Sequence, residues 1–181
     1  RNENLDKFTS QFFEKNESVQ EASFFSSSSK YGTPHKQSAL ADFIEFTSSE
    51  IQILSDTIVG NKRNLKLKIT PERKINKIDL TTDDAFVLNS MSVQGVEFEI
   101  EKSEFKINPG QFLTYYLSFE DKDVTIELDF EENLSPSLNF IETSFDLFES
   151  EKFNFKPRED YMMPMPFVNT DAIVLSKKIK L

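Results

Sequence analysis

The alternation of apolar and polar residues over Val124–Glu131 constrains the fold more than any other feature of the sequence. Every second residue in this segment is apolar, and the residues between them are threonine, glutamate or aspartate. Successive side chains of a β-strand point to opposite faces, so a period of two predicts a strand with one buried and one solvated face. A solvated face is typical of antiparallel sheets rather than of parallel α/β sheets.

Other segments repeat this pattern. Leu65–Ile69 alternates with lysine and Val96–Glu101 with glutamate. Six further segments are rich in β-branched and aromatic residues and also predict strands: 51–59, 75–80, 86–93, 112–119, 140–148 and 172–181. Turn residues separate them, such as Gly60-Asn61 and Gln94-Gly95. About nine short strands predict an all-β chain, an antiparallel, jelly-roll-like β-sandwich spanning residues 49–181.

Residues 1–48 have a different pattern. Apolar side chains recur with helical spacing near the start, which predicts a short amphipathic helix near residues 4–15 with Asn2 or Asn4 as its N-cap. A serine-rich stretch follows. We expect an N-terminal arm that packs onto the sandwich through Phe8, Phe12, Phe24 and Phe25.

The net charge of −10 and the absence of cysteine narrow the classes of function. Acidic residues outnumber basic ones 31 to 21, which disfavours binding to nucleic acid or to an anionic membrane surface. Without cysteine there are no disulfides, thiolate nucleophiles or Cys-ligated zinc. No apolar run reaches the ~18 residues of a membrane span, so we expect no membrane insertion. A start at Arg1 without a signal sequence indicates a processed or excised form.

The residue types that carry catalysis are scarce. The single histidine, His35, lies between Ser, Gly and Pro residues, so a zinc centre built on two imidazoles cannot be assembled from this chain alone. Neither a glycine-rich phosphate loop nor a G-x-S-x-G motif is present. We therefore predict no catalytic, cofactor-binding or metal-binding residues and no enzymatic activity in this chain.

Two acidic pairs allow an alternative. Asp83-Asp84 and Asp121-x-Asp123 could in principle supply the carboxylates of a hydrolase or of a calcium site. Both pairs also fit turns, in which aspartate hydrogen-bonds to nearby backbone. We favour the turns and predict that calcium does not stabilise the protein.

A second irregular segment, Glu149–Asn169, holds three of the seven prolines and three of the four methionines. Repeated proline excludes a helix interior or a central strand, so this segment should cross between the last two strands. Its apolar residues either cover an open end of the sandwich or form an adaptable contact surface for another polypeptide. The predicted interaction residues are Tyr161, Met162, Met163, Met165 and Phe167.

The aromatic composition bears on a second possible function, an independent carbohydrate-binding module. Nineteen phenylalanines, four tyrosines and no tryptophan favour core packing over sugar stacking. A sugar-binding module would need exposed, coplanar rings on one sheet face. The candidates for such a platform are Phe112, Tyr115, Tyr116 and Phe119.

Two regions near opposite ends of the chain resemble a known family. Leu5–Phe13 is similar to the "D-x-W-T-x-Q-F" element that follows the membrane spans of membrane-anchored M28-family zinc aminopeptidases, the group that includes vacuolar membrane proteases. Pro157-Arg158, Met162-Met163-Pro164 and Thr170–Lys177 resemble the closing Pro-Arg pair, Met-Pro pair and "D-x-x-V-x-K" strand of that family. Phe8 stands where tryptophan is expected, and Glu159 stands where a second proline is common.

This resemblance implies that the chain is a non-catalytic accessory domain of a membrane-bound metallopeptidase. The zinc-binding peptidase domain and the transmembrane helices would lie upstream, and none of their metal ligands falls in this chain. The resemblance places the domain on the extracytoplasmic side of a membrane, in the periplasm, a lumen or the cell exterior. The expected partners are the upstream peptidase domain or substrate polypeptides.

Overall fold

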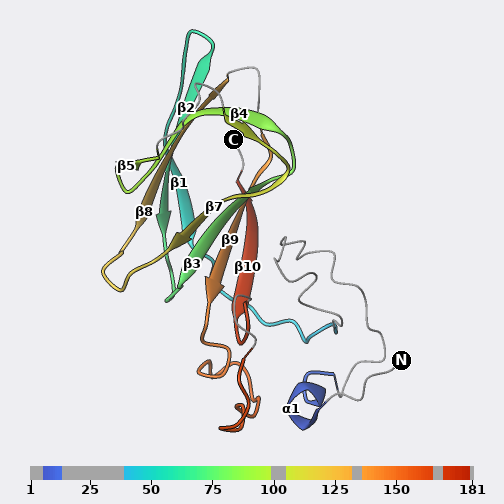
Figure 1. The fold of residues 1–181 in the computed structure, drawn as a ribbon. Helices are drawn as coiled ribbons and strands as arrows, with labels where there is room; N and C mark the ends of the chain where they lie inside the picture. The colour runs from blue at the N-terminus through green and yellow to red at the C-terminus, as the bar shows by residue number, and fades with distance from the viewer. Residues whose placement is uncertain (1–5, 14–38, 99–104, 132–135, 165–168, 180–181) are drawn as a thin grey trace. The chain divides into compact units, whose positions relative to one another are not determined.

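The computed structural model describes residues 6–13, 39–98, 105–131, 136–164 and 169–179. These residues contain one short helix, α1 (Lys7–Ser10), and ten strands (Figure 1). The strands are β1 (Glu50–Val59), β2 (Lys62–Thr70), β3 (Lys77–Thr82), β4 (Phe86–Val93), β5 (Val96–Glu97), β6 (Phe105–Ile107), β7 (Gly110–Tyr116), β8 (Val124–Glu131), β9 (Leu138–Ser144) and β10 (Ile173–Ile179).

The strands form two antiparallel sheets, which confirms the predicted all-β sandwich. One sheet has the order β1-β2-β8-β4-β5, with β6 also paired to β4, and the other has the order β10-β9-β3-β7. The predicted strands 86–93 and 124–131 coincide with β4 and β8. The strand number is ten rather than about nine because β6, only three residues long, was not predicted.

A single apolar core joins the facing sides of the two sheets. Alternate residues of β2 and β8 are fully buried, as the period of two predicts. In the other sheet, Ile78 and Leu80 of β3 and Phe140 of β9 are buried in the same cluster. The opposite face of the larger sheet carries cross-strand ion pairs, Lys66–Glu127 at 2.6 Å and Lys68–Asp123 at 2.9 Å. Because these pairs are half-exposed, each contributes little to stability.

The hairpin between β4 and β5 depends on two residues with positive φ. Gln94 has φ 53° and Gly95 has φ 75°, the left-handed pair that a two-residue type I′ turn requires. The Gln94 side chain also donates to the backbone O of Asp123 and accepts from the backbone N of Thr125. The turn predicted at Gln94-Gly95 is confirmed.

Gly95→Ala is expected to lower the free energy of unfolding by about 1 kcal/mol. No atom lies within 4 Å of a Cβ built at this position, so the cost comes from backbone strain and not from a clash. Chemical denaturation measures the change. Asn61→Ala, at a turn residue without positive φ, is the control and should change stability by less than about 0.5 kcal/mol. Equal effects of the two substitutions would contradict the assigned turn.

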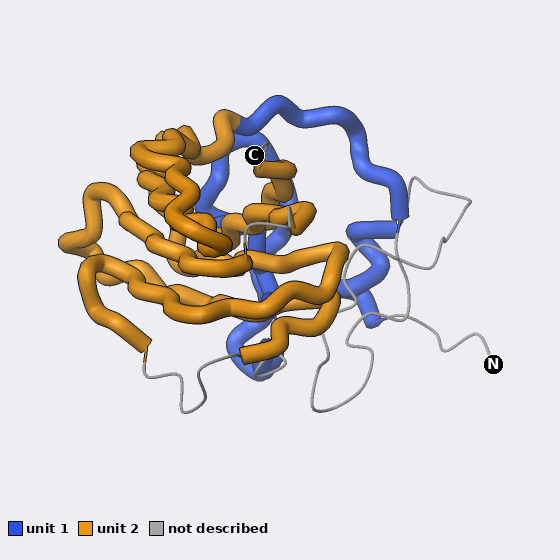
Figure 2. Tube along the Cα trace, turned by 90° about the horizontal axis from the view of Figure 1, so that it is seen from above, with its two compact units in different colours: residues 1–46, 145–173 blue, residues 47–144, 174–181 orange. Residues whose placement is uncertain are grey.

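The chain forms two compact units (Figure 2). Unit 1 comprises residues 1–46 and 145–173, and unit 2 comprises residues 47–144 and 174–181. Unit 2 is built from the two sheets. The predicted arm, residues 1–48, lies largely outside the described residues, as do Phe24 and Phe25, so its packing onto the sandwich stays a prediction.

Helix α1 is shorter than predicted, and its cap is a different residue. Among the described residues of the predicted 4–15 helix, only Lys7–Ser10 is helical and 11–13 form a turn. The N-cap is Asp6, not Asn2 or Asn4, because its carboxylate accepts a hydrogen bond from the backbone N of Thr9 at 2.7 Å. Of the three apolar residues that suggested the helix, Leu5 lies outside the described residues, and Phe8 and Phe12 pack against other segments of unit 1.

The prediction of a crossover between the last two strands is confirmed. Strand β9 ends at Ser144, and no helix or strand occurs before β10 in the described part of residues 145–172. The strand expected at 140–148 is therefore too long at its C-terminal end. Phe148, its last predicted residue, contacts the rings of Phe8 and Phe12 instead of extending the sheet.

Candidate interaction site

Unit 1 brings together the two sequence regions that carry the family resemblance. Gln11, from the first region, forms two hydrogen bonds with the backbone of Lys156, just before the second. Its Nε2 donates to the carbonyl O of Lys156 at 3.1 Å, and its Oε1 accepts from the backbone N at 2.8 Å. A primary amide can satisfy both backbone groups of one residue in this way. These bonds join segments 145 residues apart in sequence.

Aromatic rings fill the space around α1. Phe12 lies 5.5 Å from Phe8 and 4.7 Å from Phe155, measured between ring centroids. Phe153 stacks on Phe155 at 5.4 Å and on Phe46 at 5.9 Å. Tilted and offset contacts of this kind stabilise a cluster beyond the area that they bury. They join Phe153 and Phe155 of the irregular segment to Phe12 and Phe46.

Arg158 links Phe8 of α1 to Asp171 of the second region. Its guanidinium carbon lies 4.3 Å from the centroid of the Phe8 ring. The same group donates from Nε and Nη2 to the two carboxylate oxygens of Asp171, at 3.0 and 2.7 Å. A planar guanidinium can stack on a ring and bind a carboxylate with two hydrogen bonds at once, which lysine cannot do. Arg158 therefore holds Phe8 and Asp171 together within unit 1.

The predicted interaction residues follow Arg158 directly. Tyr161 and Met163 are exposed, and Met162 is half-buried. The backbone N of Met162 donates to the carbonyl O of Glu159 at 2.8 Å, which closes a turn. Met165 and Phe167 lie outside the described residues. The sequence alone did not indicate that Arg158 anchors this turn, although both Arg158 and Asp171 belong to the resembling region.

The four aromatic residues considered for sugar binding do not form one platform. Phe112 and Tyr115 pack against the core, and Phe112 makes an edge contact with Phe86 at 5.6 Å. Tyr116 and Phe119 are exposed. Tyr115 and Tyr116 are consecutive in β7, so their side chains point to opposite faces of the sheet.

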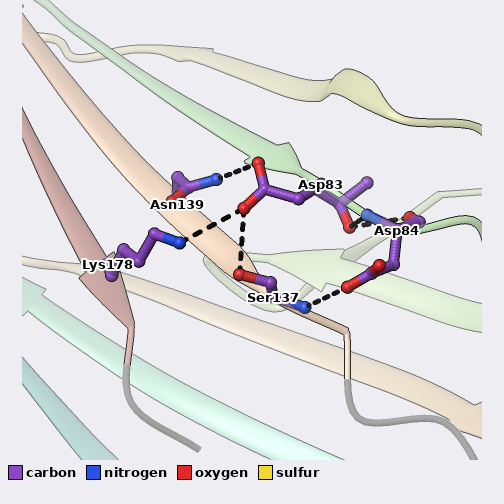
Figure 3. A network of polar contacts seen from close by, with 6 residues as sticks. Asp83, Asp84, Ser137, Asn139 and Lys178 are labelled. Carbon is purple, nitrogen blue, oxygen red and sulfur yellow. Dashed lines mark hydrogen bonds and ion pairs between the residues drawn. The ribbon is translucent and has the colours of Figure 1, made fainter.

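Asp83 and Asp84 lie in the connection between β3 and β4 and bind the start of β9 (Figure 3). Asp83 accepts hydrogen bonds from Ser137 Oγ and Asn139 Nδ2, both at 3.1 Å, and lies 3.4 Å from Lys178 Nζ. Asp84 accepts from the backbone N of Ser137 at 3.2 Å. The pair lies at the bend between β3 and β4, and its carboxylates bind neighbouring strands rather than their own backbone, unlike the expected turn. The carboxylates of Asp83 and Asp84 thus act as hydrogen-bond acceptors that connect the bend to the start of β9.

These donors lower the pKa of Asp83, with Ser137 first, then Asn139, and Lys178 contributing less. A carboxyl whose pKa is lower folded than unfolded stabilises the protein above its unfolded pKa, near 3.8, and loses that contribution as the pH falls through the folded value. Asp83→Asn should therefore be less stable than wild type at pH 7, with a difference that shrinks from about pH 4 downward. Urea unfolding across this range measures the difference. A constant difference at every pH would contradict the assigned network.

Asp121 belongs to a turn between β7 and β8, as predicted. Its carboxylate accepts from the backbone N of Ser118 at 2.8 Å and from the hydroxyl of Tyr115 at 3.2 Å. The bond from Ser118 is the main cause of the lowered pKa of Asp121. Asp123 pairs with Lys68 instead. The two carboxylates are thus used separately.

A buried polar network in unit 2 was not predicted. Glu142 is fully buried, and its Oε2 accepts from the backbone N of Ser49 at 2.8 Å and from the Ser49 hydroxyl. Its Oε1 accepts from Nε of Arg73 at 3.2 Å. Lys177 Nζ lies 3.5 Å from the carbonyl O of Ser49. The network attaches the residue before β1 to β9 and β10.

The described residues contain no group of three or more His, Cys, Asp or Glu side chains that could hold a metal ion. His35 lies outside them. None of the helices in the described ranges is long and apolar enough to cross a membrane.

Comparison with known proteins gives no relative: no protein-family model, curated protein or solved structure matches this chain. The observations that bear on function are therefore those of the chain itself. The most specific of them is the joining of the two resembling regions within unit 1 through Gln11 and Arg158.

Proposed function

We propose that this chain is a non-catalytic accessory domain of a membrane-bound M28-type zinc metallopeptidase, on the extracytoplasmic side. The domain acts through contacts with the peptidase domain of the parent protein or with substrate polypeptides. The zinc belongs to that peptidase domain.

One observation carries the proposal. Residues of both resembling regions make contacts within unit 1: Asp6 caps α1, Gln11 binds the backbone of Lys156, and Arg158 joins Phe8 to Asp171. Phe8, which replaces the expected tryptophan, still provides the flat ring on which Arg158 stacks.

The proposal is tested with the peptidase domain encoded in the same reading frame. The tagged 181-residue chain should co-purify with that domain, and deleting these residues from the full-length protein should change its zinc-dependent aminopeptidase activity. Absence of contact, together with unchanged activity after deletion, counts against the proposal. A glycan array probed with the chain tests the carbohydrate-binding alternative, which the positions of Phe112, Tyr115, Tyr116 and Phe119 do not favour.

A further inference from the structure

The turn after Arg158 and the residue that follows it expose two large apolar side chains within three residues. Tyr161 is 76% exposed and Met163 is 86% exposed. A single exposed apolar residue is ordinary on a protein surface, but an exposed aromatic ring and an exposed flexible thioether only two residues apart are typical of contact surfaces.

This turn is held in place before any partner binds. Arg158, at its start, is fixed by Asp171 through two hydrogen bonds and by the Phe8 ring. The bond from Met162 N to Glu159 O closes the turn itself. A preorganised surface binds more tightly because less conformational freedom is lost on association.

The charge around the two side chains is negative. Glu159 and Asp160 are both exposed and directly precede Tyr161. Arg158 is the one cation in residues 157–164, and it is engaged with Asp171. No cation of the described residues pairs with Glu159 or Asp160. The charge of Glu159 also raises the pKa of Tyr161, which places the phenol within the field of that carboxylate.

We propose that Tyr161 and Met163 form an anchor that inserts into an apolar pocket ringed by lysine or arginine side chains on the peptidase domain of the parent protein. This inference rests on the proposed function. Large apolar side chains at the centre of an interface supply most of the binding energy. Glu159 and Asp160 face the basic rim, where opposite charges speed association and select the partner.

The test measures binding of the full 181-residue chain to the purified peptidase domain from the same reading frame, by calorimetry and by association kinetics at two salt concentrations. Tyr161→Ser combined with Met163→Ser is expected to weaken binding and to raise the dissociation constant by about tenfold or more. Glu159→Gln combined with Asp160→Asn is expected to slow association and to flatten its salt dependence. Phe119→Ser, at a 98% exposed ring of unit 2, is the matched control and should leave the dissociation constant unchanged. Circular dichroism checks that each variant is folded.

The possible outcomes test the anchor and the proposed accessory function separately. If the wild-type chain binds and the Tyr161/Met163 variant binds equally well, the anchor is wrong and the accessory function stands. If removing the two acidic charges speeds association, the rim is not basic and the proposed partner chemistry is wrong. If the wild-type chain does not bind the peptidase domain, the anchor is wrong, and the accessory function is then decided by whether deleting the chain from the full-length protein changes the aminopeptidase activity.

Discussion

Phe130→Ala is expected to lower the free energy of unfolding by about 3–5 kcal/mol. Phe130 is fully buried in β8, and its ring lies 5.9 Å from that of Phe86 in β4. The guanidinium carbon of Arg63 lies 5.9 Å from the same ring. Truncation removes these contacts and leaves a cavity that the paired strands on either side cannot close. Since domains are stable by only about 5–15 kcal/mol, the loss is a large part of the total.

Phe119→Ala is the matched control. It removes the same atoms from a side chain that is almost entirely exposed, so the change should stay within about 0.5 kcal/mol. Urea denaturation followed by circular dichroism measures both variants. Comparable losses from the two substitutions would mean that Phe130 is not buried in the core.

The strands could be predicted where one face is buried along the whole segment. In β8 the buried and half-buried residues alternate without interruption, so both the strand and its inward face follow from the sequence. Strand β6 has three residues, which is too few to show a period of two. Within the described residues it pairs with β4. The end of β9 was misplaced because Phe145–Phe148 keeps the aromatic character of a strand after the chain has left the sheet.

The contacts of unit 1 could not be predicted from the sequence. A glutamine at position 11 and a lysine at position 156 carry no signal that the side chain of one binds the backbone of the other. Helix propensity was equally uninformative, because α1 is a single turn held by Asp6 and by aromatic contacts to distant residues. Arg158 and Asp171 both stood out in the sequence, but nothing in the sequence pairs them, and the structure alone shows their contact.

The burial of Glu142 could have been predicted from the sequence. Leu138 and Phe140 precede it at a spacing of two, so alternation places its side chain on the core face with theirs. The register agrees, because Glu142 lies opposite the buried Ile78 of β3. A carboxylate at a core position needs hydrogen-bond donors or a cation nearby. The sequence does not show that Ser49 and Arg73 provide them.

Glu142→Ala is expected to lower the free energy of unfolding by roughly 3 kcal/mol, the lower end of the range for breaking a buried ion pair. The lower end applies because the side chain of Arg73 remains 16% exposed while that of Glu142 is fully buried. The substitution deprives the backbone N and hydroxyl of Ser49, and the Arg73 guanidinium, of this acceptor. A buried donor that has lost its acceptor is no longer compensated by a hydrogen bond for its removal from water, so the folded state becomes less stable.

Glu127→Ala is the matched control, because Glu127 pairs with Lys66 at 2.6 Å on the solvated face and its side chain is 38% exposed. Its loss should cost less than about 1 kcal/mol. Glu142→Gln, which keeps the shape and one acceptor oxygen, should fall between wild type and Glu142→Ala. Denaturant unfolding at pH 7 ranks the three variants. If Glu142→Ala proves no more damaging than Glu127→Ala, then Glu142 does not hold the chain before β1 to β9, and the start of β1 must be fixed by its pairing with β2 alone.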